Sequence, residues 1–175
     1  AYDPEMKKFL MCGPYTNTHL YFLYDPANGD WDAEPIKTPF DNNIEVDTCV
    51  YVPGGVVVCP TQKLWQYRSK EKVWKELPVT GKLPRQRTDS TGICYDSKRD
   101  RLLFFGVDLN GNISAYDMKS GVITSLMPEG EKEAKESAMS REIVYLPEVD
   151  IVICGSRIET KEGKMYWLIY DCAKN

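Results

Sequence analysis

The chain has 175 residues, which suggests about one domain. Its 22 basic and 26 acidic residues leave a net charge of −4, so no global attraction to nucleic-acid phosphates or anionic membranes is expected. No apolar run approaches the ~20 residues that a membrane-spanning helix needs, and we expect no membrane insertion. The single histidine, His19, excludes any mechanism that requires two imidazoles from this chain.

Three landmarks recur along the chain. A tyrosine that ends a short apolar run returns at intervals of 49, 44 and 50 residues. A second apolar run ends eight to ten residues after each tyrosine, and a third run then ends in another tyrosine. A fixed period of this size is typical of repeat architectures. In order, the landmarks are Tyr2, Cys12 and Tyr24; Tyr51, Cys59 and Tyr67; Tyr95, Phe105 and Tyr116; and Tyr145, Cys154 and Tyr170.

The repeat divides the chain into units at approximately 1–43, 44–87, 88–137 and 138–175. Each apolar run has four to six residues, is rich in Val, Ile, Leu, Phe and Tyr, and is bounded by Pro, Gly, Asn or Asp, which predicts strands. The runs VVVC, LLFF and IVIC are apolar at every position, which predicts strands buried on both faces. Pro53-Gly54-Gly55, Asn28-Gly29 and Ser120-Gly121 have hairpin chemistry.

The predicted fold class is therefore all-β, with four antiparallel strands repeated as the blades of a β-propeller. One segment differs in composition: residues 129–138 are rich in charge, and Glu131 stands four residues before Lys135. We expect a solvated helical turn or a charged loop there.

The third unit, PRQRTDSTGICYDSKRDRLLFFG followed by AYDMKSG, resembles the kelch repeat family, whose unit runs from Pro-Arg through Gly-Gly to Tyr-Asp and then Trp. Arg87 occupies the family's arginine position. The resemblance covers essentially the whole chain and implies blades like those of kelch proteins and the central domain of galactose oxidase. It also implies that Trp31 and Trp74 are core wedges on outer strands. The chain departs from the family at the second glycine of the doublet, which is replaced by Pro14, Thr61, Val107 and Ser156, and at Ile123, which stands in place of Trp.

Counting strands predicts three in the first unit, four in each middle unit and three in the last, or about three and a half blades. A closed ring of six or seven blades would need roughly 280 to 340 residues. We therefore expect a fragment of a longer protein or one member of an assembly. The open faces of the terminal blades would be apolar, and another protein chain or the missing remainder of the propeller is expected to cover them.

The six cysteines suggest packing more than chemistry. Cys12, Cys59 and Cys154 occupy the same strand position in different units, which favours small buried side chains over disulfide partners. No Cys-x-x-Cys motif or Cys/His cluster is present, so no zinc site is predicted. Reduced thiols favour the cytoplasm, while secretion stays open because a natural N-terminus with a signal peptide could be absent.

In a propeller, the loops that enter the inner strands and those that join the second and third strands gather at one mouth of the channel. Arginines there could bind a carboxylate of a ligand or of a partner protein, and carboxylates there could accept hydrogen bonds from hydroxyl groups. The alternative interpretation is that Arg87 and its equivalents brace adjacent blades. The candidate ligand-binding residues are Arg87, Asp89, Arg141, Asp47, Asp108 and Arg157, with Arg85 and Tyr15 beside them.

Two functions fit these observations. The first is a non-catalytic binding or scaffold module for a protein or a glycan, with no cofactor. The second is a propeller-based enzyme acting on carbohydrate, such as an oxidase, epimerase or lyase, with its site at the channel mouth. Copper-radical chemistry of the galactose oxidase kind needs two histidines, and this chain has one. The binding module is favoured.

Overall fold

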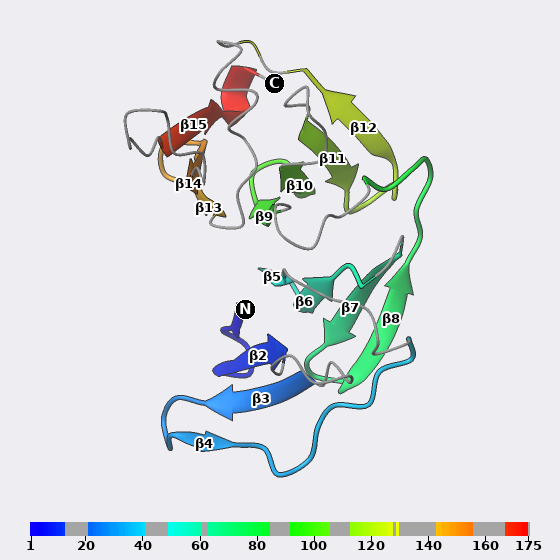
Figure 1. The fold of residues 1–175 in the computed structure, drawn as a ribbon, viewed down its shortest axis with the longest axis vertical. Helices are drawn as coiled ribbons and strands as arrows, with labels where there is room; N and C mark the ends of the chain where they lie inside the picture. Colours follow the sequence, from blue (N-terminus) through cyan, green and yellow to red (C-terminus); the bar gives the residue numbers. More distant parts are fainter. Residues whose placement is uncertain are drawn as a thin grey trace, which may run out of the picture. The chain divides into compact units, whose positions relative to one another are not determined.

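The computed structural model describes residues 1–12, 21–40, 49–60, 63–84, 92–105, 113–127, 129, 143–155 and 167–174. Within them, the secondary structure consists of strands and one short 3-10 helix, η1 (Cys172–Lys174) (Figure 1). The chain divides into two compact units, Ala1–Pro78 and Val79–Asn175. No helix of the described part is long and apolar enough to cross a membrane.

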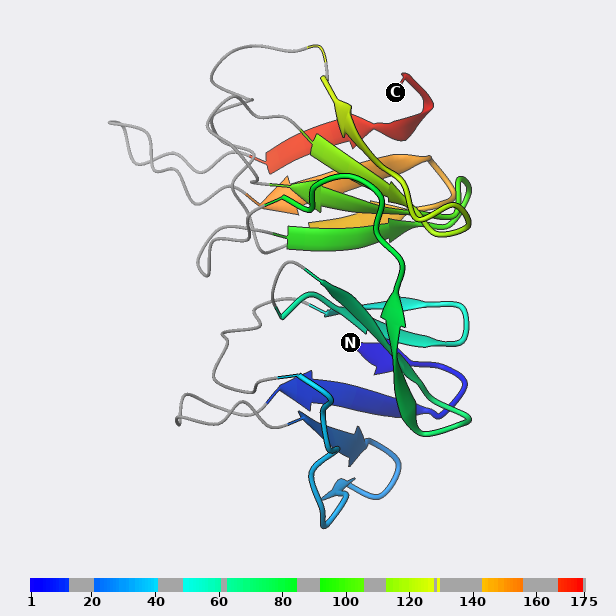
Figure 2. The same cartoon turned by 90° about the vertical axis from the view of Figure 1, so that its right-hand side faces the viewer.

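The first unit contains two antiparallel sheets of four strands each, called blade 1 and blade 2. Each sheet follows the chain order, so consecutive strands are neighbours (Figure 2). Blade 1 consists of β1 (Tyr2–Asp3), β2 (Lys8–Cys12), β3 (Tyr21–Asp25) and β4 (Asp30–Trp31). Blade 2 consists of β5 (Cys49–Val52), β6 (Gly55–Val58), β7 (Leu64–Arg68) and β8 (Val73–Leu77).

The second unit contains one four-stranded and one three-stranded antiparallel sheet, called blade 3 and blade 4, again in chain order. Blade 3 consists of β9 (Gly92–Asp96), β10 (Arg101–Phe105), β11 (Ile113–Asp117) and β12 (Ile123–Leu126). Blade 4 consists of β13 (Ile143–Leu146), β14 (Ile151–Gly155) and β15 (Trp167–Asp171). The all-β fold built from propeller blades is thus confirmed.

The strand count of the first unit was wrong by one. Tyr2 and Asp3 already form an inner strand, because Tyr2 pairs with Phe9 and Asp3 pairs with Lys8. The turn that follows is closed by the Asp3 carboxylate. The four-stranded middle sheets and the three described strands of blade 4 agree with the expectation.

Aspartates at the ends of strands close the turns. Asp3 Oδ1 accepts the backbone N–H groups of Glu5 and Met6 at 2.8 and 3.1 Å. Asp96 and Asp117 accept the N–H groups two and three residues further on in the same way. This Asx-type turn supplies hydrogen bonds that a strand ladder would otherwise provide. The Tyr-Asp pairs of the repeat are therefore turn signals.

Gly55 marks a close approach of two backbones in blade 2. Its φ is +152°, and a Cβ atom at this position would lie 1.9 Å from the carbonyl oxygen of Tyr67. The two-residue turn between β5 and β6 thus requires a glycine at its end. Gly29, at φ +72°, ends the β3–β4 turn with nothing within 4 Å of such a Cβ atom.

Each unit has its own core between its two blades. In the first unit, Leu10, Tyr21 and Leu23 of blade 1 cluster with residues of blade 2, namely Val56, Val58 and Tyr67. In the second unit, Cys94, Leu103, Phe105, Ile113 and Ala115 of blade 3 cluster with Val152, Cys154, Tyr170 and Cys172. We call the face that blade 1 presents to blade 2, and blade 3 to blade 4, the forward face. The equivalent face of the other two blades takes the same name, and the opposite face of each blade is its backward face.

Burial confirms part of the expectation for continuous apolar runs. All four residues of VVVC and of LLFF are at most 2% exposed. In IVIC, Val152 and Cys154 are buried, whereas Ile151 and Ile153 are only half-buried. The difference arises because Ile153 lies on the forward face of blade 4, which stays open in the described part of the chain.

The expectation that Trp31 and Trp74 pack in blade cores was right for Trp74 and wrong for Trp31. Trp74 of β8 packs in the first core, 5.3 Å from Tyr21 and 5.2 Å from Tyr67 between ring centroids. Trp31 of β4 is instead 52% exposed, because it lies on the backward face of blade 1, where the described residues supply no covering sheet. Residues 130–138 of the charged segment lie outside the described residues.

Candidate functional site

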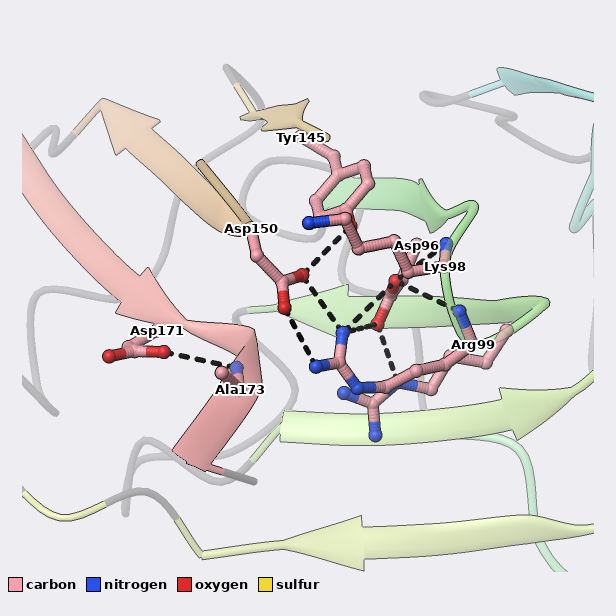
Figure 3. Close-up of polar contacts among 8 residues, drawn as sticks. Asp96, Lys98, Arg99, Tyr145, Asp150, Asp171 and Ala173 are labelled. Atoms are coloured by element: carbon pink, nitrogen blue, oxygen red, sulfur yellow. Dashed lines mark hydrogen bonds and ion pairs between the residues drawn. The ribbon is translucent and has the colours of Figure 1, made fainter. Parts of the chain in front are cut away.

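A polar cluster joins blade 3 to blade 4 at the turns between their first two strands. Arg99 Nη1 and Nη2 donate to the two oxygens of Asp150 at 2.9 and 2.8 Å (Figure 3). Arg99 Nη1 also donates to Asp96 Oδ2 at 3.1 Å, and Arg101 Nε donates to the same oxygen at 2.9 Å. The Tyr145 hydroxyl donates to Asp150 Oδ1 at 2.9 Å. Two arginines thus neutralise two aspartates.

The ionisation states of Asp150 and Tyr145 in this cluster are fixed by their neighbours. The hydrogen bonds from Arg99 hold the pKa of Asp150 far below its usual range. Burial, followed by the hydrogen bond to Asp150, raises the pKa of Tyr145 well above its usual value. Asp96 is fully buried and bound by both arginines. A general acid or base needs a pKa near the working pH, whereas the pKa values of Asp150 and Tyr145 are moved away from it. The cluster therefore works as an inter-blade clamp.

The first unit has a clamp at the corresponding turns. Glu5, from the β1–β2 turn, accepts the hydroxyl of Tyr51 at 3.2 Å and the backbone N–H of Gly54 at 3.1 Å. Lys70, from the β7–β8 turn, pairs with the other oxygen of Glu5 at 2.9 Å. The hydrogen bond from Lys70 is the largest of several contacts that lower the pKa of Glu5. Asp3, fully buried, accepts the hydroxyl of Ser69.

The backward face of blade 1 is an exposed aromatic surface. Its rings are in contact: Tyr2 and Phe9 lie 5.0 Å apart between centroids, and Tyr24 and Trp31 lie 5.1 Å apart. Cross-strand pairing aligns them, since Phe9 pairs with Tyr24 and Tyr24 with Trp31. Tyr2, Phe9, Met11 and Trp31 are 37–52% exposed. The aromatic face consists of Tyr2, Phe9, Met11, Phe22, Tyr24 and Trp31.

The forward face of blade 4 is the second exposed apolar surface. Val144 pairs with Ile153, and Ile153 with Ile169, so the three side chains form one cross-strand row. Trp167 lies two residues before Ile169 on the same side of β15. Val144, Trp167 and Ile169 are 49%, 67% and 68% exposed. We call Val144, Ile153, Trp167 and Ile169 the aliphatic-tryptophan face.

Contiguous exposed apolar surfaces of this kind are unusual in a stable monomer and mark interaction sites. The opposite faces of the same two blades are buried in the unit cores. The exposure therefore does not reflect a generally apolar surface. The two faces are the candidate functional surfaces of the described part of the chain.

None of the ligand-binding residues expected at the channel mouth falls in the described ranges. Arg87, Asp89, Arg141, Asp47, Asp108 and Arg157 all lie outside them, as do Arg85, Tyr15 and His19. Their grouping stays a prediction. Among the described residues, no group of three or more His, Cys, Asp or Glu could hold a metal ion.

The described cysteines are packing residues. The expectation that Cys59 and Cys154 share a strand position was wrong by one residue, because the pairing of Tyr51 with Val56 and of Tyr145 with Val152 makes Cys154 equivalent to Val58. Cys49, Cys59, Cys94, Cys154 and Cys172 form no disulfide, and all except Cys49 are buried. Burial raises the pKa of Cys59 and of Cys154 to about 12. Since the thiolate is the reactive form, these thiols are chemically quiet in the folded protein.

Four sheets of antiparallel strands in chain order, packed face to face in pairs, define propeller blades. Among solved structures, the chain is similar to TolB from Acinetobacter baumannii, with a TM-score of 0.64 and 16% identity over 97% of this chain and 39% of that one. It thus spans 39% of the TolB chain, and at this identity the likeness shows the fold alone. The computationally designed Ika4 protein aligns with a TM-score of 0.48 and 14% identity over 93% of this chain and 91% of that one.

The chain has a β-propeller fold. No family model matches it, and no curated protein does.

The sequence predicted apolar open faces on the terminal blades, but it predicted neither clamp and did not identify the residues of the aromatic face. Arg99 and Asp150 are 51 positions apart, and no motif links them. A signal for the aromatic face was present: Phe9 and Met11 in β2 and Phe22 and Tyr24 in β3 alternate with buried Leu10 and Leu23. Alternating large side chains on one face show what that face contains, but not whether another sheet covers it.

Proposed function

We propose that this chain is a kelch-like β-propeller binding or scaffold module, without catalysis of its own, that recognises a protein ligand. The observation that carries the proposal is the aromatic face of blade 1. Tyrosine and tryptophan dominate the energetics of protein interfaces because they bury a large area with few rotatable bonds. Met11 adds an adaptable apolar contact on the same face.

The aromatic face is also preorganised. Tyr2 packs on Phe9, Phe9 lies 6.4 Å from Tyr24, and Tyr24 packs on Trp31. Rings that are already packed against one another lose little conformational freedom on binding, which lowers the entropic cost of association. Between the two ligand classes, a protein fits better than a glycan, because the face is composed mainly of apolar groups and a glycan needs many hydrogen-bond partners.

The charged clusters of the described residues support a structural role for those groups. Both Asp96 and Asp150 are bound by arginines, and Glu5 is bound by Lys70 and two further donors. The kelch-like assignment itself rests on the repeated landmarks and on Arg87 in the third unit. The alternative, a carbohydrate-active enzyme with its site at the channel mouth, stays a prediction.

A random dodecapeptide phage library selected on the immobilised 175-residue chain tests the proposal. We expect selected peptides to bind the wild type in solution, and the Trp31→Ala variant to bind them about tenfold or more weakly. Met127→Ala, which removes a 78% exposed side chain that is not part of the aromatic face, is the matched control and should bind normally. Failure to select any peptide, or equal binding by Trp31→Ala, would contradict the proposal.

A further inference from the structure

Within the chain, the forward face of one blade packs on the backward face of the next blade in two places. The exposed backward face of blade 1 and the exposed forward face of blade 4 are equivalent to the two surfaces that meet in these contacts. Blade 1 meets blade 2 through the forward face of one and the backward face of the other, and blade 3 meets blade 4 in the same way. Blade 1 leaves its backward face exposed, and blade 4 leaves its forward face exposed.

The register of the repeats shows the equivalence residue by residue. On the second strand of each blade, Ile153 corresponds to Leu10 and Leu103, which lie in the two unit cores. On the third strand, Ile169 corresponds to Leu23 and Ala115. The exposed side chains of blade 4 therefore occupy the positions that blades 1 and 3 use to pack on their successors.

The aromatic face has the complementary equivalence. Phe9 corresponds to Val56 and Val152, and Tyr24 corresponds to Tyr67 and Tyr170, which are buried against the preceding blade. Trp31 corresponds to Trp74, which packs in the first core. The aromatic face is thus equivalent to the surfaces on which the forward face of a preceding blade packs.

We propose that the aliphatic-tryptophan face of one copy of this chain docks on the aromatic face of a second copy, in a head-to-tail contact. This inference rests on the proposed function, because it names a second copy as a protein partner for the same aromatic surface. The chain itself carries both complementary faces, and the two inter-blade contacts within it supply the geometry. Because the two faces differ, the contact is heterologous.

The contact is expected to resemble a domain core. On one side it buries Val144, Ile153 and Ile169, and on the other Phe9, Tyr24 and Trp31. All six are apolar or aromatic, and their side chains are half-buried or exposed in the single copy. Burial of such side chains on both partners is the main driving force for association.

Complementation between two variants tests the inference. Ile169→Glu places a charge on the forward face of blade 4, and Trp31→Glu places one on the backward face of blade 1. Both positions are more than half exposed, so folding should survive, and far-ultraviolet circular dichroism checks it. Met127→Glu, at a residue 78% exposed outside both faces, is the matched control.

Sedimentation velocity over micromolar concentrations gives the readout. We expect the wild type and Met127→Glu to self-associate, and each face variant alone to associate at least tenfold more weakly. An equimolar mixture of the two face variants should associate again, because the Trp31→Glu copy keeps its forward face and the Ile169→Glu copy keeps its backward face.

Three results would overturn the inference. They are a monomeric wild type, association insensitive to both variants, and loss of association by Trp31→Glu but not by Ile169→Glu, which would indicate a symmetric contact of two aromatic faces. Failure here is distinguishable from failure of the proposed function: a monomeric chain that still binds selected peptides through Trp31 refutes only the second-copy partner.

Discussion

Arg99 and Asp150 form a two-pronged ion pair, with N–O distances of 2.9 and 2.8 Å, between the first turn of blade 3 and the first turn of blade 4. The guanidinium of Arg99 reaches Asp96 as well, so that one side chain ties together two turns 51 positions apart. In such a pair the geometry carries specificity as well as energy, because a planar fork matches both carboxylate oxygens.

Replacement of Arg99 tests the clamp. Arg99→Ala leaves the Asp150 carboxylate without its main partner, and we expect a clear loss of stability in denaturant unfolding followed by circular dichroism. Arg99→Lys keeps a charge but loses the fork, and is expected to recover only part of the loss. The control is Arg68→Ala, whose ion pair with Glu71 is 3.7 Å long and exposed, and it should cost well under about 1 kcal/mol. Equal effects of Arg99→Ala and Arg68→Ala would refute the clamp.

The same pair sets an acid limit to stability. Because Arg99 lowers the pKa of Asp150 in the folded state, the unfolded chain binds a proton there more readily. The stabilisation is therefore fully present above the unfolded pKa of about 4 and is lost as the pH falls through the lower folded pKa. We expect the stability difference between wild type and Asp150→Asn to be constant near neutral pH and to shrink below about pH 4. Thermal melts measure it, and a difference independent of pH down to acid would contradict the assignment.

The backbone approach at Gly55 predicts a strong effect of one methyl group. Gly55→Ala places a Cβ atom against the carbonyl of Tyr67 in an unfavourable backbone conformation, and we expect a loss of about 3 kcal/mol or more. Gly29→Ala is the matched control, since Gly29 has a positive φ but open space around it, and should cost about 1 kcal/mol. Chemical denaturation compares them. Similar losses of stability at both positions would show that the backbone conformation, and not the close contact with Tyr67, determines the cost of replacing Gly55.

The buried thiols predict a pattern of reactivity. In a background with Cys12→Ser and Cys49→Ser, the remaining cysteines are all buried, and burial raises the pKa of Cys172 to about 11 and that of Cys94 well above its usual value. We expect negligible reaction with a thiol-specific disulfide reagent at neutral pH in the native protein, and full reaction of all four thiols in concentrated guanidinium chloride. Rapid native labelling would contradict the packing described for these residues.

Local patterns explain why most of the fold could be predicted. The strand positions and the turns of the described residues follow from short apolar runs, Gly and Pro punctuation and the Tyr-Asp pairs, all of which act within a few residues. Tyr2 was identified as the end of an apolar run, but the two-residue strand β1 was not counted, because two residues show no periodicity and only their pairing with Phe9 and Lys8 defines the strand. Trp31 was misplaced because its repeat position predicts burial only where a preceding blade is present.

The sequence by itself determined the repeat period, the all-β class and the alternation of side chains along each strand, because these depend on neighbours along the chain. Only the tertiary structure decided which faces are covered. Tyr24 and Tyr67 end equivalent strands, yet Tyr67 is buried against blade 1 while Tyr24 lies on the exposed aromatic face. Burial and ion pairing depend on what the folded chain brings alongside. For that reason the Arg99–Asp150 clamp, and the residues that form each open face, emerge only in three dimensions.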